Sequence, residues 1–428
     1  MASLPKAPKG KELEDFVAAL LQCTGHFVEK NIQERDVLEL DVAATRYDKA
    51  VPKDWVFEVK GDKWGFSEIF KLLGHMTYLQ MEAGAFVTTA PPHDRDIAFY
   101  CDRCDSVNIK LLVVDDFETA ADRFDSAGFG RADDLLREIW RYSFWVERCL
   151  IQHLRDSARA SPTALAPREA LRYYGLINSG VFFTRNPTER VNKLYQAYQD
   201  HPVLTLGAAR EMAGEAFDAC TSGQSPLIGE ALFKNEHPLL QACMYLEHRA
   251  RLAILKGAVD YLCQEEGQEE PDKDNPMIDL SLVGLPSSFL QALSKMRGQP
   301  YFWLYPVFWQ AFLWGWGGFI LNDREGQEFK EMSLQTGLPT EHIPAALEAF
   351  DLLFPLPGGR LWLTSTNQAS YRFVRMVPGP FRGIGAFQRL KKSGMEEYRD
   401  LKLGGQYTVH DMGTWHNAAA RLLGDGAS

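Results

Sequence analysis

Residues 37–60 read VLELDVAATRYDKAVPKDWVFEVK, and this stretch contains two apolar runs that carry charged residues at alternate positions. Glu39 and Asp41 alternate with aliphatic residues in the first run. Glu58 and Lys60 take the same alternate positions in the second run. Because successive side chains of a strand point to opposite faces, each pair shares one face of its strand. If the two strands are neighbours, three carboxylates and one ammonium group converge on one patch.

These residue types are the minimum set for metal-dependent hydrolysis of a phosphodiester. A hard divalent cation such as Mg²⁺ binds one or two carboxylates and keeps several waters, and a nearby lysine can orient or deprotonate the attacking water. An acid two residues before a lysine is also common on the solvent face of a strand, and the chain repeats it at 328–330 and 400–402. Only the triplet at 58–60 closes an apolar run and follows a second acid-bearing run.

The neighbouring sequence predicts that both runs belong to one α/β domain with a small mixed sheet. Gly25 is a plausible end of the first helix, residues 51–54 a turn, and Ser67 the N-cap of the second helix. The expected order, α-β-β-β-α-β-α-β, comprises helix 12–23, strands 26–32, 36–45 and 55–60, helix 67–82, strand 85–89, helix 94–104 and strand 109–114.

This order and these residues resemble the PD-(D/E)xK nuclease superfamily, most closely its Mrr-type restriction endonuclease branch. The resemblance covers roughly residues 10–116. The matching positions are Leu13-Glu14, Gly25, Asp41, Glu58-Val59-Lys60 and the apolar strand 85–89. Two features depart from the family pattern: Leu40 replaces the proline of the superfamily's label, and the glycine-rich stretch before the aspartate is absent.

The resemblance implies a role for each matching residue. Asp41 and Glu58 would bind Mg²⁺ or Mn²⁺, helped by the carbonyl group of Val59. Lys60 would position the attacking water, and Glu14 would reach a metal or its water from the first helix. For Glu14 the alternative is a solvated first-turn acid favoured by the helix dipole.

Two further residues near these positions have weaker claims to a role. Glu39 is expected to be a neighbour of Asp41 that does not itself bind the metal. Lys71, on the expected helix 67–82, could contact a phosphate, although a single helical lysine is usually only solvated.

Length, charge and cysteine usage limit the class of protein. A chain of 428 residues is expected to hold two or three domains, which we place at 1–125, 126–270 and 271–428. The net charge of −11 argues against general adhesion to nucleic acids but allows a local contact patch. Seven cysteines and an N-terminus without an apolar signal segment predict a reduced, cytoplasmic location. Cys101 and Cys104 form a single CxxC pair without further ligands of metal-like spacing, so we expect ordinary helical thiols.

The uncharged segment 301–321 is long enough to span a membrane, but its proline, glycines and many aromatic residues favour a buried aromatic segment. The charged, proline-containing segment 264–276 predicts a domain boundary. Because the sequence has no nucleotide-binding P-loop, ATP-driven translocation would need another subunit.

Residues 325–378 resemble a winged helix-turn-helix. The expected elements are helix 327–336, turn 337–339, a helix from Thr340 to Phe354 and a hairpin of strands 356–363 and 371–377. The second helix carries acids and no Lys or Arg, so a packing or protein-contact role is an alternative to DNA contact. The basic segment 371–402 could grip a nucleic-acid backbone or could simply be a solvated tail. Its candidate residues are Arg372, Arg375, Arg382, Arg389, Lys391 and Lys392, with Phe373, Phe381 and Phe387.

The leading hypothesis is a Mg²⁺-dependent DNA endonuclease, and the family resemblance suggests a restriction or phage-defence effector. An RNase or a junction resolvase is an alternative within the enzyme class. The rival from another class is a non-catalytic adaptor that retains a nuclease-like fold to bind nucleic acid or protein. An adaptor would leave the charged groups apart or buried in fixed ion pairs. The sequence does not determine the substrate's sequence or structure, the activating trigger or the oligomeric state.

Overall fold

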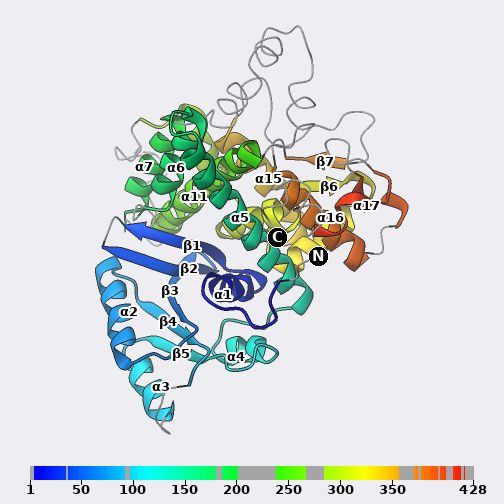
Figure 1. The fold of residues 1–428 in the computed structure, drawn as a ribbon. Helices are drawn as coiled ribbons and strands as arrows, with labels where there is room; N and C mark the ends of the chain where they lie inside the picture. The colour runs from blue at the N-terminus through cyan, green and yellow to red at the C-terminus, as the bar shows by residue number, and fades with distance from the viewer. Residues whose placement is uncertain are drawn as a thin grey trace.

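A computed structural model describes the greater part of the chain. The described residues are 4–34, 37–91, 97–179, 186–200, 238–266, 284–355, 371–374, 377–393, 396–401, 408–415 and 419. The fold is mixed α/β: a five-stranded sheet comes first, and a mainly helical region follows (Figure 1). The coarse fold class predicted from the sequence is therefore confirmed.

The sheet runs in the order β1-β2-β3-β4-β5, antiparallel from β1 to β3 and parallel from β3 to β5. Its strands are β1 (Phe27–Glu34), β2 (Leu38–Asp48), β3 (Val51–Lys60), β4 (Ala83–Thr88) and β5 (Ile109–Val113). The helices α1 (Lys11–Cys23), α2 (Phe66–Leu79), α3 (Ile97–Asp105) and α4 (Ala120–Ser126) accompany it. One core lies between the sheet and α1, and another lies between the opposite face and α2.

Two local expectations in this domain are wrong. The predicted turn at 51–54 belongs to β3, and the chain instead reverses at Lys49, which has a φ of 56°. Pro52 is tolerated there because β3 pairs with β4 only from Trp55 onward, so its missing N–H removes no bond to β4. The N-cap of α2 is Gly65 rather than Ser67, which lies inside the first turn.

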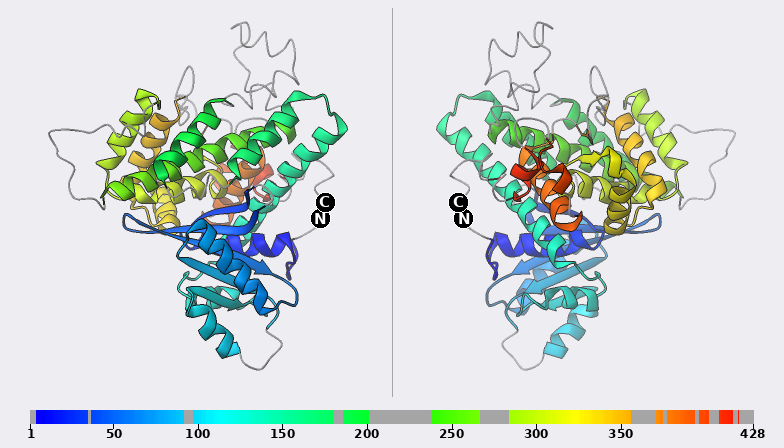
Figure 2. Two further views of the ribbon diagram at one scale, coloured as in Figure 1. Left: turned by 90° about the vertical axis from the view of Figure 1, so that its left-hand side faces the viewer. Right: turned by 90° about the vertical axis from the view of Figure 1, so that its right-hand side faces the viewer.

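Long helices form the second half of the fold and pack against the β1 side of the sheet domain (Figures 1 and 2). They are α5 (Asp134–Ala160), α6 (Leu165–Ile177), α7 (Pro187–Asp200), α11 (Pro238–Glu266) and α12 (Ser287–Arg297). Asp133 begins α5 by accepting the Leu136 N–H at 2.8 Å. α11 includes residues 264–266, so the start of the predicted boundary segment is helical; residues 267–276 lie outside the described part.

The aromatic segment 301–321 is buried at Phe302 and from Tyr305 onward, as predicted, whereas Tyr301 is exposed. It forms the 3₁₀ turn η3 (Phe302–Leu304), α13 (Tyr305–Gln310), the π-helical turn η4 (Ala311–Gly315) and β6 (Phe319–Leu321). Trp309 stacks on Phe350 with ring centroids 3.7 Å apart, and its indole N–H donates to the Ala346 carbonyl at 2.9 Å. Over the residues that the structure describes, no helix is long and apolar enough to cross a membrane.

The C-terminal part contains α14 (Glu325–Thr336), α15 (Ile343–Leu353), β7 (Tyr371–Phe373), α16 (Gly379–Ser393) and α17 (Val409–Met412), with 3₁₀ turns η5 (Asn322–Arg324), η6 (Thr340–His342) and η7 (Glu396–Tyr398). Thr340 lies in η6 and does not cap α15, whose N-cap is His342. β7 pairs with β6, and the expected wing strand 356–363 lies outside the described residues. The winged-helix interpretation therefore stays a prediction.

Two arginines of the expected basic grip are buried instead. Arg389 donates to Glu328 Oε1 at 2.7 Å and to the carbonyls of Trp316 and Phe319. Arg382 donates to the Val374 carbonyl at 2.8 Å. These guanidinium groups satisfy backbone carbonyls inside the fold and cannot also grip a nucleic acid; the side chains of Arg375 and Lys392 lie outside the described part.

The expected three-domain division is not decided by the packing. The largest core cluster continues from α1 through one face of the sheet into α5, α11, α13 and α16. Residue 125 lies within α4, and residue 270 lies outside the described part. The boundaries stay predictions.

Candidate active site

The predicted acids meet where β2 and β3 separate. The paired ladder of these strands ends at Val42 and Phe57. One residue further along each strand are Asp41 and Glu58, and the Asp41 Oδ2 atom accepts the backbone N–H of Val59 at 2.8 Å. A side chain of β2 thus holds the end of β3 beyond the last backbone pair. At this point of separation the charge of Asp41 acts on Lys60, and the charge of Glu58 acts on Asp41.

Glu58 is the most buried member of the site, with 1% of its surface exposed. Its Oε1 atom lies 2.8 Å from Lys60 Nζ and 2.9 Å from Lys71 Nζ. Burial alone would raise the pKa of Glu58, but the two ammonium groups outweigh it and hold the pKa below its ordinary value. Glu58 is therefore ionised at neutral pH and fixed between two lysines.

Asp41 is in the opposite electrostatic situation. Burial, followed by the charges of Glu14 and Glu58, raises the pKa of Asp41 to about 7. The Val59 N–H and Lys11 favour the charged form but do not compensate. Asp41 is thus a crowded carboxyl group whose negative charge lacks sufficient positive charge around it.

Glu14 belongs to α1, and its charge acts on Asp41. It is buried, its Oε2 atom lies 3.1 Å from Lys11 Nζ, and burial raises its pKa against the opposing effect of Lys11. Lys11 also lies 3.5 Å from the exposed Glu39, which stands at the rim. Lys11 is a site residue that the sequence analysis missed; its position three residues before Glu14 on a helix was the available signal.

The helix α2 contributes further charged residues on the Glu58 side of the site. Lys71 contacts Glu58, and Glu68 Oε2 lies 3.9 Å from Lys60 Nζ. His75, one turn beyond Lys71, has a pKa lowered by burial and influenced by the charge of Glu58. Three polar residues of α2 therefore lie along the side of the helix that approaches the acids.

The donor set suits a hard cation in its chemistry. Within the described ranges, no three Asp, Glu, His or Cys side chains are arranged closely enough to hold a metal ion. Mg²⁺ sites commonly use only one or two carboxylates together with waters and substrate oxygens. Asp41 and Glu58 are two carboxylates of this kind. A cation beside Asp41 would offset the burial and the neighbouring negative charges that raise its pKa.

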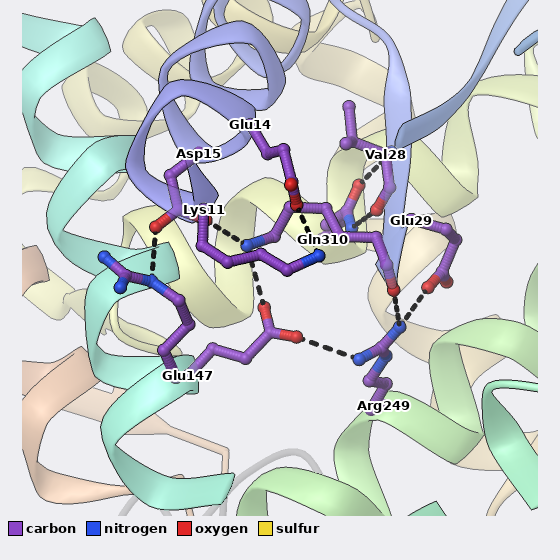
Figure 3. A network of polar contacts seen from close by, with 10 residues as sticks. Lys11, Glu14, Asp15, Val28, Glu29, Glu147, Arg249 and Gln310 are labelled. Atoms are coloured by element: carbon purple, nitrogen blue, oxygen red, sulfur yellow. Dashed lines mark hydrogen bonds and ion pairs between the residues drawn. The ribbon is translucent and has the colours of Figure 1, made fainter. Parts of the chain in front are cut away.

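A buried network behind the site fixes α1 (Figure 3). Asp15, the neighbour of Glu14, binds Lys30 at 2.5 Å and Arg148 of α5 at 2.7 Å. Arg249 of α11 then binds Glu29 and Glu147 at 2.8 and 2.9 Å. Gln310 of α13 exchanges two hydrogen bonds with the backbone of Val28, at 2.9 and 2.7 Å. The helical region thereby holds both α1 and β1.

A cavity of about 870 Å³ lies at the other end of the sheet, between β1–β3 and the helices α7 and α11. On its helical side, Asp260 accepts from Tyr47, Arg190 and Lys256 at 2.8, 2.5 and 2.7 Å. Lys256 also lies 3.6 Å from Asp54, so two acids and two bases pair with one another here. The residues that line the cavity do not include Asp41 or Glu58.

Comparison of the chain with protein-family models, curated proteins and solved structures gave no match. The assignment of the site therefore rests on its own geometry and chemistry.

Proposed function

We propose that this protein is a metal-dependent DNA endonuclease that hydrolyses phosphodiester bonds. The observation that carries the proposal is the Asp41 carboxylate, held by the Val59 N–H beside Glu58 and Lys60 and given a pKa of about 7 by burial and neighbouring acids. The element order α1-β1-β2-β3-α2-β4-α3-β5 supports a PD-(D/E)xK-like domain.

Each residue of the site has a definite task in this proposal. Asp41 and Glu58, with the Val59 carbonyl, would hold Mg²⁺ or Mn²⁺. The cation would supply Lewis acidity and lower the pKa of water. Lys60, which is about one-third exposed, orients the attacking water. Glu14 adds negative charge from α1 and keeps Lys11 beside the site.

The substrate class and biological role belong to the same proposal. DNA is the proposed substrate, and a restriction or phage-defence role is the proposed context. The helical region and the winged-helix-like part would recognise a target or a partner protein. The acidic α15 lies against α12, where Glu348 is 3.7 Å from Lys295, so a packing role is the simpler one for that helix.

A second candidate function is a non-catalytic adaptor that binds nucleic acid or protein. The observation in its favour is Glu58, which is almost fully buried and ion-paired with both Lys60 and Lys71. A nuclease-like domain that has lost its catalytic activity would keep such charged residues in fixed ion pairs. The raised pKa of Asp41 favours the enzyme, because a purely structural site has no reason to keep an uncompensated carboxyl group.

A cleavage assay separates the two candidates. Single-stranded and duplex DNA, RNA and a four-way junction are incubated with protein in Mg²⁺, in Mn²⁺ and in chelator. Metal-dependent cleavage by the wild type that is lost in both Asp41→Ala and Lys60→Ala supports the enzyme. Binding without cleavage of any substrate, by all three proteins alike, would establish the adaptor.

A further inference from the structure

Two lysines contact the single carboxylate of Glu58. Lys60 and Lys71 both contact its Oε1 atom, at 2.8 and 2.9 Å, so two ammonium groups share one carboxylate. The other acid near Lys60 is Glu68, whose Oε2 atom lies 3.9 Å from Lys60 Nζ. Because Lys60 already pairs with Glu58, Lys71 is a second ammonium group, and it lies on the side of α2 that approaches Glu58.

Lys71 differs from Lys60 in where it is attached and how far it is exposed. Lys60 belongs to β3, next to Val59, and its side chain is 35% exposed. Lys71 is on α2, between the buried Ile69 and Leu72, and its side chain is 46% exposed. A lysine ammonium has three N–H donors. The contact with Glu58 uses one of them and orients the group, so the remaining donors can bind a ligand that arrives from solvent.

We propose that Lys71 binds a non-bridging phosphate oxygen of the substrate, and that Glu58 holds the Lys71 ammonium in position before the substrate arrives. This inference rests on the proposed nuclease function and names a residue that grips the substrate. Lysine is a common phosphate ligand that acts as a point charge. Lys71 would contribute mainly to binding, whereas Lys60 acts on the attacking water.

The test compares Lys71→Ala and Lys71→Arg with a matched control. Lys110→Ala removes a lysine of nearly equal exposure, 44%, that is ion-paired with Asp105 at 2.8 Å on the same sheet but near the start of β5. The steady-state constants of DNA cleavage are measured in Mg²⁺. DNA affinity is measured separately in Ca²⁺ over a range of salt concentrations, and thermal melts establish that each variant is folded.

We expect Lys71→Ala to raise KM and weaken DNA binding about tenfold, with kcat changed less than about threefold. The slope of log affinity against log salt should fall by about one, because one phosphate contact is lost. Lys71→Arg should restore most of the affinity, and Lys110→Ala should resemble the wild type.

Three results would overturn the inference. Lys71→Ala could bind DNA with wild-type affinity and salt slope, or Lys110→Ala could lose as much affinity as Lys71→Ala. A loss of kcat alone would assign Lys71 to the positioning of Glu58 instead. The proposed function fails separately: if the wild type binds DNA without cutting it, the binding measurements still decide the role of Lys71, and if it neither binds nor cuts, both proposals are wrong.

Discussion

The backbone N–H of Val59 donates to the Oδ2 atom of Asp41 across 2.8 Å, just beyond the last paired residues of β2 and β3. This bond joins two strands by a side chain where their backbone ladder has ended. It places a carboxyl group that is poorly compensated beside Glu58, which is itself fixed by two lysines. The pKa of Asp41 is raised and that of Glu58 is lowered, and this difference between the two acids can be tested.

The first prediction concerns activity. Asp41→Ala and Lys60→Ala should each lower Mg²⁺-dependent cleavage by roughly 100-fold or more, because one removes charge that holds the cation and the other removes the group that orients water. Lys60→Ala should still bind the cation. Thermal melts serve as the control for folding. Undiminished cutting by both folded variants would show that the motif has no catalytic role.

The second prediction concerns pH. Because the pKa of Asp41 rises from 3.8 to about 7 on folding, the native state keeps a proton that the unfolded state has lost between about pH 4 and pH 7. Stability therefore falls as the pH rises through this window and does not change further above it. Asp41→Asn keeps an acceptor for the Val59 N–H but removes this charge. The free energy of unfolding of Asp41→Asn should therefore exceed that of the wild type by an amount that grows with pH.

The expected size of this effect is about 2 kcal/mol in chelator between pH 4 and pH 8. The rise in the pKa of Asp41 from 3.8 to about 7 corresponds to a change of about 4 kcal/mol in the free energy of unfolding if the charge is not screened. We take about half of that value, because Asp41 is only partly buried and water screens its charge. Urea unfolding at several pH values measures it. Asp48→Asn, at the exposed opposite end of β2, is the matched control. An Asp41→Asn advantage that is equal at pH 4 and pH 8 would contradict the prediction.

The third prediction concerns the cation and stability. A cation that binds only the native protein stabilises it according to its concentration relative to Kd. Mg²⁺ should therefore raise the melting temperature of the wild type at pH 8 and should do so much less for Asp41→Ala. Equal shifts in the two proteins would place the cation elsewhere.

The fourth prediction concerns the network behind α1. Arg249→Ala leaves Glu29 and Glu147 buried without the guanidinium group that they share, which should cost about 3–5 kcal/mol of stability. Denaturant unfolding measures the loss. Arg159→Ala is the control, because Arg159 is exposed and its ion pair with Asp156, at 3.6 Å, lies in water. Its loss should lower the free energy of unfolding by less than about 0.5 kcal/mol. Similar losses in both variants would mean that the network contributes nothing special.

The fifth prediction distinguishes a buried arginine from a binding arginine. Arg389→Ala should lower the melting temperature strongly, because Glu328 and the carbonyls of Trp316 and Phe319 lose their donor inside the fold. Lys391→Ala, on the exposed side of the same helix, should leave the melting temperature nearly unchanged. If Arg389→Ala melts like the wild type but binds DNA more weakly, the basic-grip interpretation of this residue is correct after all.

Several features followed from the sequence because they depend on local pattern. The alternation of Glu58 and Lys60 with aliphatic residues was enough to expect a strand, and the helix that ends before Gly25 followed from its apolar spacing. The burial of residues 305–321 was predictable because so many aromatic side chains could not remain in water. The prediction of a turn at 51–54 from local residue types was wrong. Pro52 is tolerated in β3 because this part of the strand has no second neighbouring strand that would need its backbone N–H.

Only the tertiary structure decided the features that depend on packing between distant segments. The expected basic grip contains Arg382 and Arg389, which the fold buries against backbone carbonyls, and no sequence pattern distinguishes such arginines from exposed ones. Likewise, the pKa of Asp41 depends on its burial and on Glu14, which α1 brings to β2. Arg148 of α5 holds α1 through Asp15. The sequence by itself therefore determined which residues could do chemistry and on which local elements they lie. The charge state of those residues was set by three-dimensional packing, because desolvation and Coulomb interactions depend on distance in space and not on separation along the chain.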